Sequence, residues 1–147
     1  NISDRYDHTW IVSSDRDLYQ LIDNNVSVFN IFSRKEITLQ TLEDDFEITP
    51  DLYMLSRIIE GDKSDNILGI EGIGPKRAQA LAKEYNTLDN LIDALPIKGR
   101  SKYIQNLNAG KEQLIRNEKL INLKAYCVDA ICAGKEGDEP LARLSNL

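Results

Sequence analysis

The sequence predicts a short α/β segment over residues 1–40, an almost entirely helical domain over residues 41–131 and a tail over residues 132–147. Two observations support this division. The runs HTWIVS and VSVFNIF, both rich in β-branched and aromatic residues, are typical of strands and lie within the first forty residues. Beyond them the apolar residues recur at helical spacing, and capping residues, glycine or proline separate one helical run from the next.

The first forty residues predict two strands and a hairpin partner. HTWIVS runs directly into the polar loop SDRD, after which DLYQLI is helical. VSVFNIF alternates with period two, and EITL follows a turn over residues 33–35 as its hairpin partner. A buried parallel strand needs neighbours on both sides, and only seven residues precede the first strand. We therefore expect that part of this domain lies outside the 147 residues.

Six helical runs account for most of the remaining sequence. TLEDDF begins at Thr41, and Thr49 caps the next run, which starts with Pro50 at its first position and which Gly61 is placed to end. A third run begins at Pro75. The last three runs are LDNLIDAL, SKYIQNLN and KEQLIRNEKLINL.

Composition is typical of a soluble globular protein, with 41% hydrophobic and 29% charged residues. No apolar run is long enough to cross a membrane and no signal peptide is visible, so we expect no membrane contact and a cytoplasmic location. Cys127 and Cys132 have neither a CxxC nor a zinc spacing. They are expected to be reduced core thiols of a cytosolic protein.

Charge is unevenly distributed along the chain, whose net charge is −6. Residues 1–75 hold 15 acids and 6 bases, whereas residues 76–124 hold 10 bases and 5 acids. The middle third could therefore attract phosphates, while the acidic first half repels them unless cations intervene.

The stretch GDKSDNILGIEGIGPKR, residues 61–77, places acidic residues directly before a glycine-rich turn. Glycines that include Gly72 and Gly74 allow a tight hairpin between two helices, with backbone N–H groups at the helix start facing a ligand. Lys76 and Arg77 lie in the first helical turn, where cations oppose the helix dipole unless an external anion shares the site. The stretch therefore predicts a helix–hairpin–helix motif that grips DNA phosphates without reading bases. The alternative is a plain glycine turn.

Two pairs of acidic residues are candidate metal ligands. Asp62 and Asp65 are three apart, so their carboxylates can converge on one cation. Asp15 and Asp17 follow the HTWIVS strand at its carboxyl end, the edge where active sites of parallel sheets lie. Oxygen ligands suit hard cations such as Mg²⁺ or Mn²⁺, and two pairs could hold two ions beside a scissile phosphate. Either pair alone is more typical of a solvated loop.

The order of these motifs resembles the 5′-nuclease family: flap endonucleases, phage 5′–3′ exonucleases and the 5′-nuclease domain of bacterial DNA polymerase I. SSDRDLYQL followed by GDKSDNILGIEGIGPKRA carries the resemblance, and KYIQNLNAGKEQLIRNEKLINLKAYCVDAI is similar to the phage branch. Together they cover residues 15–131. The resemblance implies an α/β remnant of a PIN-like nuclease domain in residues 1–40, followed by an all-α, SAM-like 5′–3′ exonuclease C-terminal domain. If a phage encodes the chain, its location would be the host cell cytoplasm.

The resemblance also implies a role for each matching residue. The first divalent cation, Mg²⁺ or Mn²⁺, would be bound by Asp15 and Asp17. The second would be bound by Asp62 and Asp65. Phosphates of the duplex downstream of the cut would be bound by Gly72, Gly74, Lys76 and Arg77. A K⁺ ion would be held at the hairpin by the backbone carbonyls of Ile70 and Ile73.

The implied function is a structure-specific 5′–3′ exonuclease or flap endonuclease that hydrolyses DNA with a 5′ end or flap next to duplex by a two-metal mechanism. The family's amino-terminal half, with further metal-binding acids and a helical arch, matches no position here. We therefore expect activity to require that half or a second polypeptide, and residues 1–147 alone to be inactive. The alternative is a non-catalytic, sequence-independent DNA-binding module. Retention of all four aspartates favours the nuclease.

Other conspicuous residues have ordinary structural interpretations. His8 is expected to be structural, because the family uses metal-bound water for its chemistry. Apolar helical positions favour core packing over base stacking for Tyr53, Tyr85, Tyr103 and Tyr126. Phosphate contact and simple solvation are equally favoured for Lys98, Arg100, Lys102, Lys111, Arg116 and Lys119.

Overall fold

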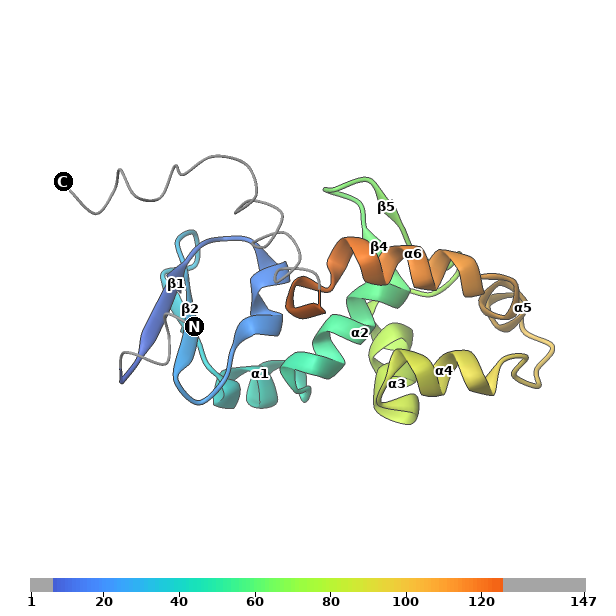
Figure 1. The fold of residues 1–147 in the computed structure, drawn as a ribbon, viewed down its shortest axis with the longest axis horizontal. Coiled ribbons are helices and arrows are strands. Elements are labelled where there is room, and N and C mark those ends of the chain that lie inside the picture. The colour runs from blue at the N-terminus through green and yellow to red at the C-terminus, as the bar shows by residue number, and fades with distance from the viewer. Residues whose placement is uncertain (1–6, 126–147) are drawn as a thin grey trace, which may run out of the picture.

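A three-stranded sheet lies at one end of the structure and most of the helices lie at the other, with helix α2 crossing between them (Figure 1). The computed structural model describes residues 7–125. The helices in this part are η2 (Arg16–Leu21), α1 (Leu39–Phe46), α2 (Pro50–Glu60), α3 (Pro75–Tyr85), α4 (Leu88–Ala94), α5 (Lys102–Ala109) and α6 (Lys111–Ile121). None of them has the length and apolar character that crossing a membrane would require.

The larger sheet consists of β1 (Thr9–Val12), β2 (Val26–Asn30) and β3 (Lys35–Ile37), in that order. β1 and β2 are parallel, and β2 and β3 form an antiparallel hairpin in which Phe29 lies opposite Glu36. The two strands and the hairpin partner thus form where the sequence predicted them. Among residues 7–125, β1 pairs with β2 alone, so the second neighbour expected for a buried parallel strand is not part of this region.

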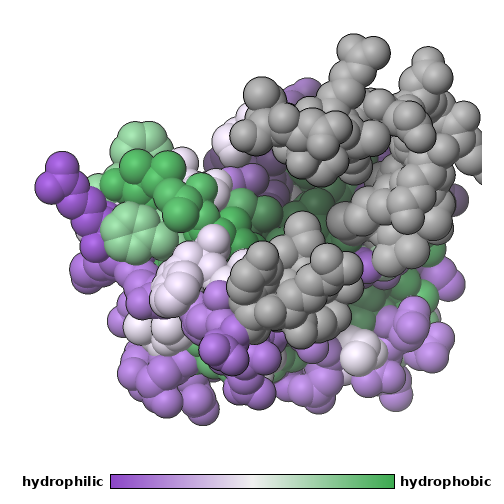
Figure 2. Space-filling view, turned by 60° about the vertical axis from the view of Figure 1, so that its left-hand side comes forward, coloured by the Kyte–Doolittle hydropathy of each residue, from purple (hydrophilic) through white to green (hydrophobic). Residues whose placement is uncertain are grey.

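The outer face of this sheet carries an exposed apolar patch. On β1, Trp10 is 58% and Val12 63% exposed, because alternate residues of a strand point to opposite faces. Phe29 lies beside Val12 on β2, and Ile31 and Phe32 continue the patch into the following turn, with Phe32 86% exposed. Figure 2 shows apolar side chains gathered on this side of the molecule and bordered by hydrophilic ones.

The start of α2 lies where local signals in the sequence predicted it, whereas α1 starts two residues earlier than predicted. The helix between β1 and β2, η2, is a 3₁₀ helix that begins at Asp15, whose carboxylate accepts a hydrogen bond from the Asp17 amide. Thr38 caps α1, and Thr49 caps α2 by accepting from the amide of Leu52. Thr41, where the sequence placed the start of a helix, therefore lies inside α1 instead, in its first turn.

A short hairpin that the sequence did not predict joins α2 to α3. It consists of β4 (Gly61–Asp62) and β5 (Ile67–Leu68), which pair antiparallel. Gly61 ends α2 with φ at +77°, and a Cβ atom on it would lie 2.3 Å from the Gly69 amide nitrogen. This close approach requires glycine. Strands of two residues are too short to show a hydrophobic period, so periodicity could not reveal them.

Two hydrophobic clusters form the core, and α2 contributes to both. The cluster at the sheet end includes Tyr19, Val28, Leu42 and Tyr53, all buried. The cluster at the helical end is formed mainly by α2, α3, α4, α5 and α6; its fully buried members include Ile59. Leu52 packs against both clusters. The domain division at residues 40 and 41 stays a prediction.

Buried amide side chains connect segments that lack regular hydrogen-bonded partners. Asn117 on α6, 1% exposed, donates to the carbonyls of Ile58 at 3.0 Å and Leu68 at 2.8 Å. Gln20 on η2 is also 1% exposed, and it donates to the Ile121 carbonyl at 2.8 Å. These contacts satisfy carbonyls at the ends of α2, β5 and α6 that would otherwise be buried without partners.

The buried position of Asn117 leads to a stability prediction. Asn117→Leu is nearly isosteric but leaves the carbonyls of Ile58 and Leu68 without their donor, so we expect a loss of about 2 kcal/mol in the free energy of unfolding. The reciprocal change Leu120→Asn, on the exposed face of the same helix, should alter it by less than about 0.5 kcal/mol. Urea denaturation followed by circular dichroism would measure both; equal effects would contradict the role of Asn117.

Candidate functional site

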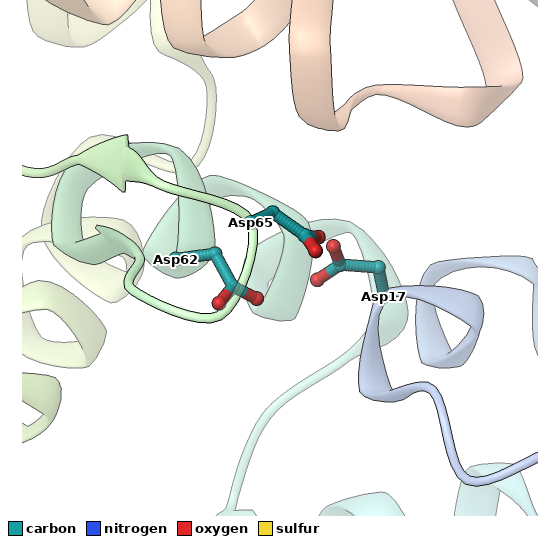
Figure 3. Close-up of side chains that lie close together, drawn as sticks. All are labelled: Asp17, Asp62 and Asp65. Atoms are coloured by element: carbon teal, nitrogen blue, oxygen red, sulfur yellow. The ribbon is translucent and has the colours of Figure 1, made fainter.

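Three carboxylates converge where the sheet end meets the β4–β5 hairpin (Figure 3). Asp17 lies in the first turn of η2, directly after β1, Asp62 ends β4, and Asp65 lies in the turn before β5. One oxygen from each lies within 4.8 Å of the others. Figure 3 shows Asp17 and Asp65 pointing toward each other from these two segments. The structure thus brings together three of the four predicted acidic residues, although they are 45 or more positions apart in two cases.

Asp15 borders the same site but is not part of this cluster. Its carboxylate is exposed and caps η2, where Oδ1 accepts from the Asp17 amide at 2.9 Å. It still lines the pocket of about 440 Å³ into which the cluster opens, together with Asp62, Ser64 and Asp65. The sequence treated Asp15 and Asp17 as equivalent partners, whereas here Asp17 faces the other acids and Asp15 holds the helix start.

Arg57 is the residue at this site that sequence reasoning missed. It comes from the last turn of α2, and its Nε donates to Asp17 Oδ1 at 3.2 Å. Its Nη2 forms an ion pair with Asp62 Oδ2. The side chains of these three residues are only 17%, 12% and 12% exposed. A basic residue one turn before the GDKSD stretch was the available signal, but only the fold shows that it faces Asp17.

The two paired aspartates have opposite pKa shifts. Burial raises the pKa of Asp17 above its ordinary value, although Arg57 acts against that shift. Burial acts in the same direction on Asp62, but hydrogen bonds from the Ser64 hydroxyl and amide, together with Arg57, bring the pKa of Asp62 below its ordinary value. Asp62 is therefore the carboxylate held more firmly in its charged form.

The donor set fits a hard divalent cation. Carboxylate oxygens are the ligands that Mg²⁺ and Mn²⁺ prefer, and the pocket is open to solvent at the exposed Asp65. Two oxygens bound to one Mg²⁺ lie at most about 4.2 Å apart, so small side-chain movements would be needed to bring all three acids into contact with one ion.

The glycine-rich hairpin between β5 and α3 has the turn geometry that the sequence predicted. Gly72 has φ at +85°, and the Ile73 amide donates to the Ile70 carbonyl at 3.1 Å to close the turn. Gly74 is the N-cap of α3, with an extended backbone and no atom within 4 Å of an added Cβ. The fold therefore requires glycine at position 72 for its positive φ, but does not require it at position 74.

The predicted phosphate-binding bases lie at the start of α3. Lys76 and Arg77 are both exposed. Arg77 donates to the Gly72 carbonyl at 2.9 Å, and its guanidinium lies 4.7 Å from the centre of the Tyr103 ring on α5. Asn106 on the same helix donates to the Glu71 carbonyl at 2.9 Å. Helix α5 thus supports the hairpin from one side. The roles assigned to these residues, and to the carbonyls of Ile70 and Ile73, stay predictions.

Tyrosines and a histidine for which the sequence predicted structural roles make structural contacts. Tyr53 is buried, which confirms core packing, and burial raises its pKa to about 12. Tyr103 packs against the core and also contacts Arg77. His8 bonds to the Ser27 hydroxyl at 2.9 Å, a structural contact. The predictions for Tyr126, Cys127 and Cys132 fall outside the described residues.

Comparison with known proteins gives a consistent family. A family model described as 5′-3′ exonuclease, C-terminal SAM fold, matches residues 48–131. The flap endonuclease of Escherichia phage T5 is 42% identical over 129 residues, which are 87% of this chain and 44% of that protein. A 5′-3′ exonuclease of Mycoplasmopsis pulmonis is 35% identical over 78% of this chain and 39% of its own length. The chain thus spans less than half the length of these relatives.

Solved structures agree with the sequence matches. A T5 5′-exonuclease mutant superposes with a TM-score of 0.84 at 41% identity, over 90% of this chain and 54% of that one. The bacteriophage T5 flap endonuclease in a pseudo-enzyme-product complex with DNA and metal ions gives a TM-score of 0.85 at 41% identity, over 90% and 49% of the two chains. This chain therefore belongs to the family of 5′–3′ exonucleases and flap endonucleases, with the helical, SAM-like C-terminal fold and a small sheet.

Proposed function

We propose that this chain is the DNA-gripping part of a structure-specific 5′-nuclease, which hydrolyses phosphodiesters of DNA that carries a 5′ end or flap next to duplex. The observation that carries the proposal is the convergence of the carboxylates of Asp17, Asp62 and Asp65 within 4.8 Å, in a chain that also presents a basic hairpin. The T5 flap endonuclease, whose structure has been solved with DNA and metal ions, supports the same substrate class.

In this proposal the four aspartates divide between two divalent cations. Asp15 and Asp17 contribute to one ion and Asp62 and Asp65 to the other, with Mg²⁺ or Mn²⁺ as the metal. When bound, such ions activate water for attack on phosphorus and stabilise the leaving oxygen. Ser64 would hold Asp62 in its charged form through the two hydrogen bonds that it donates to Oδ1.

The glycine-rich hairpin between β5 and α3 binds the DNA duplex. Gly72 and Gly74 allow a phosphate to approach the backbone, and Lys76 and Arg77 neutralise its charge. None of these groups carries base-specific information, so binding is independent of sequence. The carbonyls of Ile70 and Ile73 would hold a K⁺ ion in the same turn, because one lone pair of the Ile70 oxygen remains after its bond to the Ile73 amide.

The active enzyme would combine this chain with the amino-terminal half that its relatives possess, or with a second polypeptide. In the proposal, residues 1–40 belong to the α/β nuclease domain and residues 41–131 form the helix–hairpin–helix domain. Two features among residues 7–125 support the need for a further segment: β1 has a pairing edge not used by β2, and the apolar patch around Trp10 and Phe32 is exposed.

The alternative function is a non-catalytic module that binds DNA without reading its sequence. The pairing of Arg57 with Asp17 and Asp62 favours it to some extent, because an acidic cluster with its own cation can be purely structural. The metal-binding and cleavage predictions below separate the two functions, since only the nuclease requires a divalent cation at the aspartates; the hairpin prediction tests the DNA grip that both functions share.

Removal of a carboxylate should weaken metal binding. We expect Asp62→Asn and Asp65→Asn each to weaken the binding of Mn²⁺ by at least about tenfold, because each removes one unit of negative charge from the site. Asp93→Asn makes the same charge change on the exposed face of α4 and should have almost no effect. Isothermal titration calorimetry would measure the three dissociation constants. Equal values for all variants would refute the metal site.

Loss of the hairpin bases should change the salt dependence of DNA binding. Lys76→Ala combined with Arg77→Ala should flatten the slope of log K against log salt by about 1.8, uniformly across duplex sequences, because about 0.9 is lost for each phosphate contact. Fluorescence anisotropy with two unrelated duplexes over a salt series would measure this. An unaltered slope, or a loss confined to one duplex, would mean that the hairpin is not the phosphate clamp.

Two further variants complete the test of the glycine-rich hairpin, the first as a matched control and the second as a change in the hairpin itself. Arg34→Asn with Lys35→Ala removes an adjacent basic pair from the β2–β3 turn and should leave the slope unchanged; asparagine suits the positive φ of 53° at position 34. Gly74→Ala adds only a methyl group, with no neighbour within 4 Å in the chain. The methyl group would hinder the approach of a phosphate to the backbone, so we expect weaker DNA binding. Because it meets no atom of the chain, the melting temperature should not fall.

Catalysis should require more than this chain. We expect residues 1–147 alone to show no Mg²⁺-dependent cleavage of a 5′-flap substrate, and cleavage to return when the upstream half is joined to the chain. Gel analysis of end-labelled flap DNA would test both samples. Robust cleavage by the chain alone would contradict the proposed need for further ligands.

A further inference from the structure

Arg57 stands where a cation would bind the carboxylate cluster. Its guanidinium bridges two acids from separate segments, with Nε on Asp17 Oδ1 at 3.2 Å and Nη2 on Asp62 Oδ2. Because guanidinium cannot lose its proton in proteins, this internal cation is permanent and can leave the acids only by a movement of the side chain.

Both carboxylate oxygens of Asp62 already accept hydrogen bonds. Oδ2 pairs with Arg57, and Oδ1 accepts from the amide and hydroxyl of Ser64, the amide at 2.7 Å. Oδ1 therefore has no lone pair free, and a metal ion would bind Asp62 most readily through Oδ2, directly beside the positive charge of Arg57. The bonds to Ser64 come from the adjacent turn and hold the loop itself, whereas Arg57 reaches the acid from another helix. The contact with Arg57 is the one that can be released without rearranging the loop.

We propose that Arg57 is an internal counterion that competes with divalent cations for Asp17 and Asp62. This inference rests on the proposed metal-dependent nuclease function and assigns Arg57 a positioning role, since it acts through the two carboxylates. Its first consequence is that Asp17 and Asp62 are held close together when no metal is bound. Its second is that metal affinity is lower than three carboxylates alone would give.

The pairing of Arg57 with Asp17 and Asp62 also favours divalent over monovalent ions. Exchange of a guanidinium for a monovalent ion replaces one positive charge with another and yields no Coulombic gain. Exchange for a divalent ion doubles the positive charge that faces Asp17, Asp62 and Asp65. Arg57 therefore raises the preference of the site for Mg²⁺ or Mn²⁺ over the K⁺ and Na⁺ that are abundant in solution.

Substitution of Arg57 separates this role from a structural one. We expect Arg57→Gln to bind Mn²⁺ about tenfold more tightly than the unaltered chain, because a competing positive charge is removed from contact with the ligands. Arg57→Lys keeps the charge and should stay within about threefold of the unaltered chain. Arg16→Gln removes a positive charge that lines the same pocket, and it should have a much smaller effect than Arg57→Gln. Electron paramagnetic resonance of free Mn²⁺ would give each dissociation constant.

Thermal melting supplies a second readout that does not depend on catalysis. Without its counterion the Arg57→Gln chain should melt at a lower temperature in chelator, and Mn²⁺ should raise that temperature by more than it does for the unaltered chain. Mn²⁺ binding that Arg57→Gln weakens or leaves unchanged, while Asp62→Asn still abolishes it, would overturn the counterion role and leave the metal site intact. Binding that is insensitive to Asp62→Asn would overturn the metal site and this inference with it.

Discussion

Helix α2 is the element on which the rest of the structure depends, because each of the two hydrophobic clusters is completed by its side chains. Ile59 packs into the helical cluster, Tyr53 into the sheet cluster and Leu52 against both. A rotation of α2 about its axis would expose apolar surface on one side or the other, so its orientation is fixed by the packing of two cores. That orientation holds Arg57 toward η2 and sets where the β4–β5 hairpin begins, at Gly61, directly before Asp62.

Side-chain amides donate hydrogen bonds to the backbone carbonyls of the segment between β5 and the glycine-rich hairpin, as a neighbouring strand would do in a sheet. Gln113 and Asn117 on α6 donate to the carbonyls of Leu68 and Gly69, and Asn106 holds the carbonyl of Glu71. Buried carbonyls without a donor are costly, so these contacts favour one conformation of the segment from β5 to the hairpin. Helices α5 and α6 therefore anchor the segment that lies between the acidic turn before β5 and the basic start of α3.

Electrostatics explains how an acidic chain could serve a polyanionic substrate. The acids of the candidate metal site are gathered in one cluster, where Arg57 already neutralises part of their charge. The bases of the hairpin, Lys76 and Arg77, are exposed at the start of α3, and Arg77 contacts the Tyr103 ring and the Gly72 carbonyl. Charges of opposite sign are thus separated between two surfaces of the fold, so the net charge of −6 says little about either surface.

Caps, periods and positive-φ glycines act over a few residues, so the sequence alone predicted most of the helices, the strands of the larger sheet and the glycine turn, although it misplaced the start of α1 and did not reveal the β4–β5 hairpin. It also supplied the acidic motifs and the resemblance from which the family was predicted. Which side chains contact one another at the candidate site depends on the tertiary structure. Asp17 meets Asp62 across 45 positions, and Arg57 enters the site from a helix whose local pattern marks it only as the charged residue before two buried isoleucines. Coulombic contacts depend on distance in space, and a one-dimensional pattern does not contain that distance.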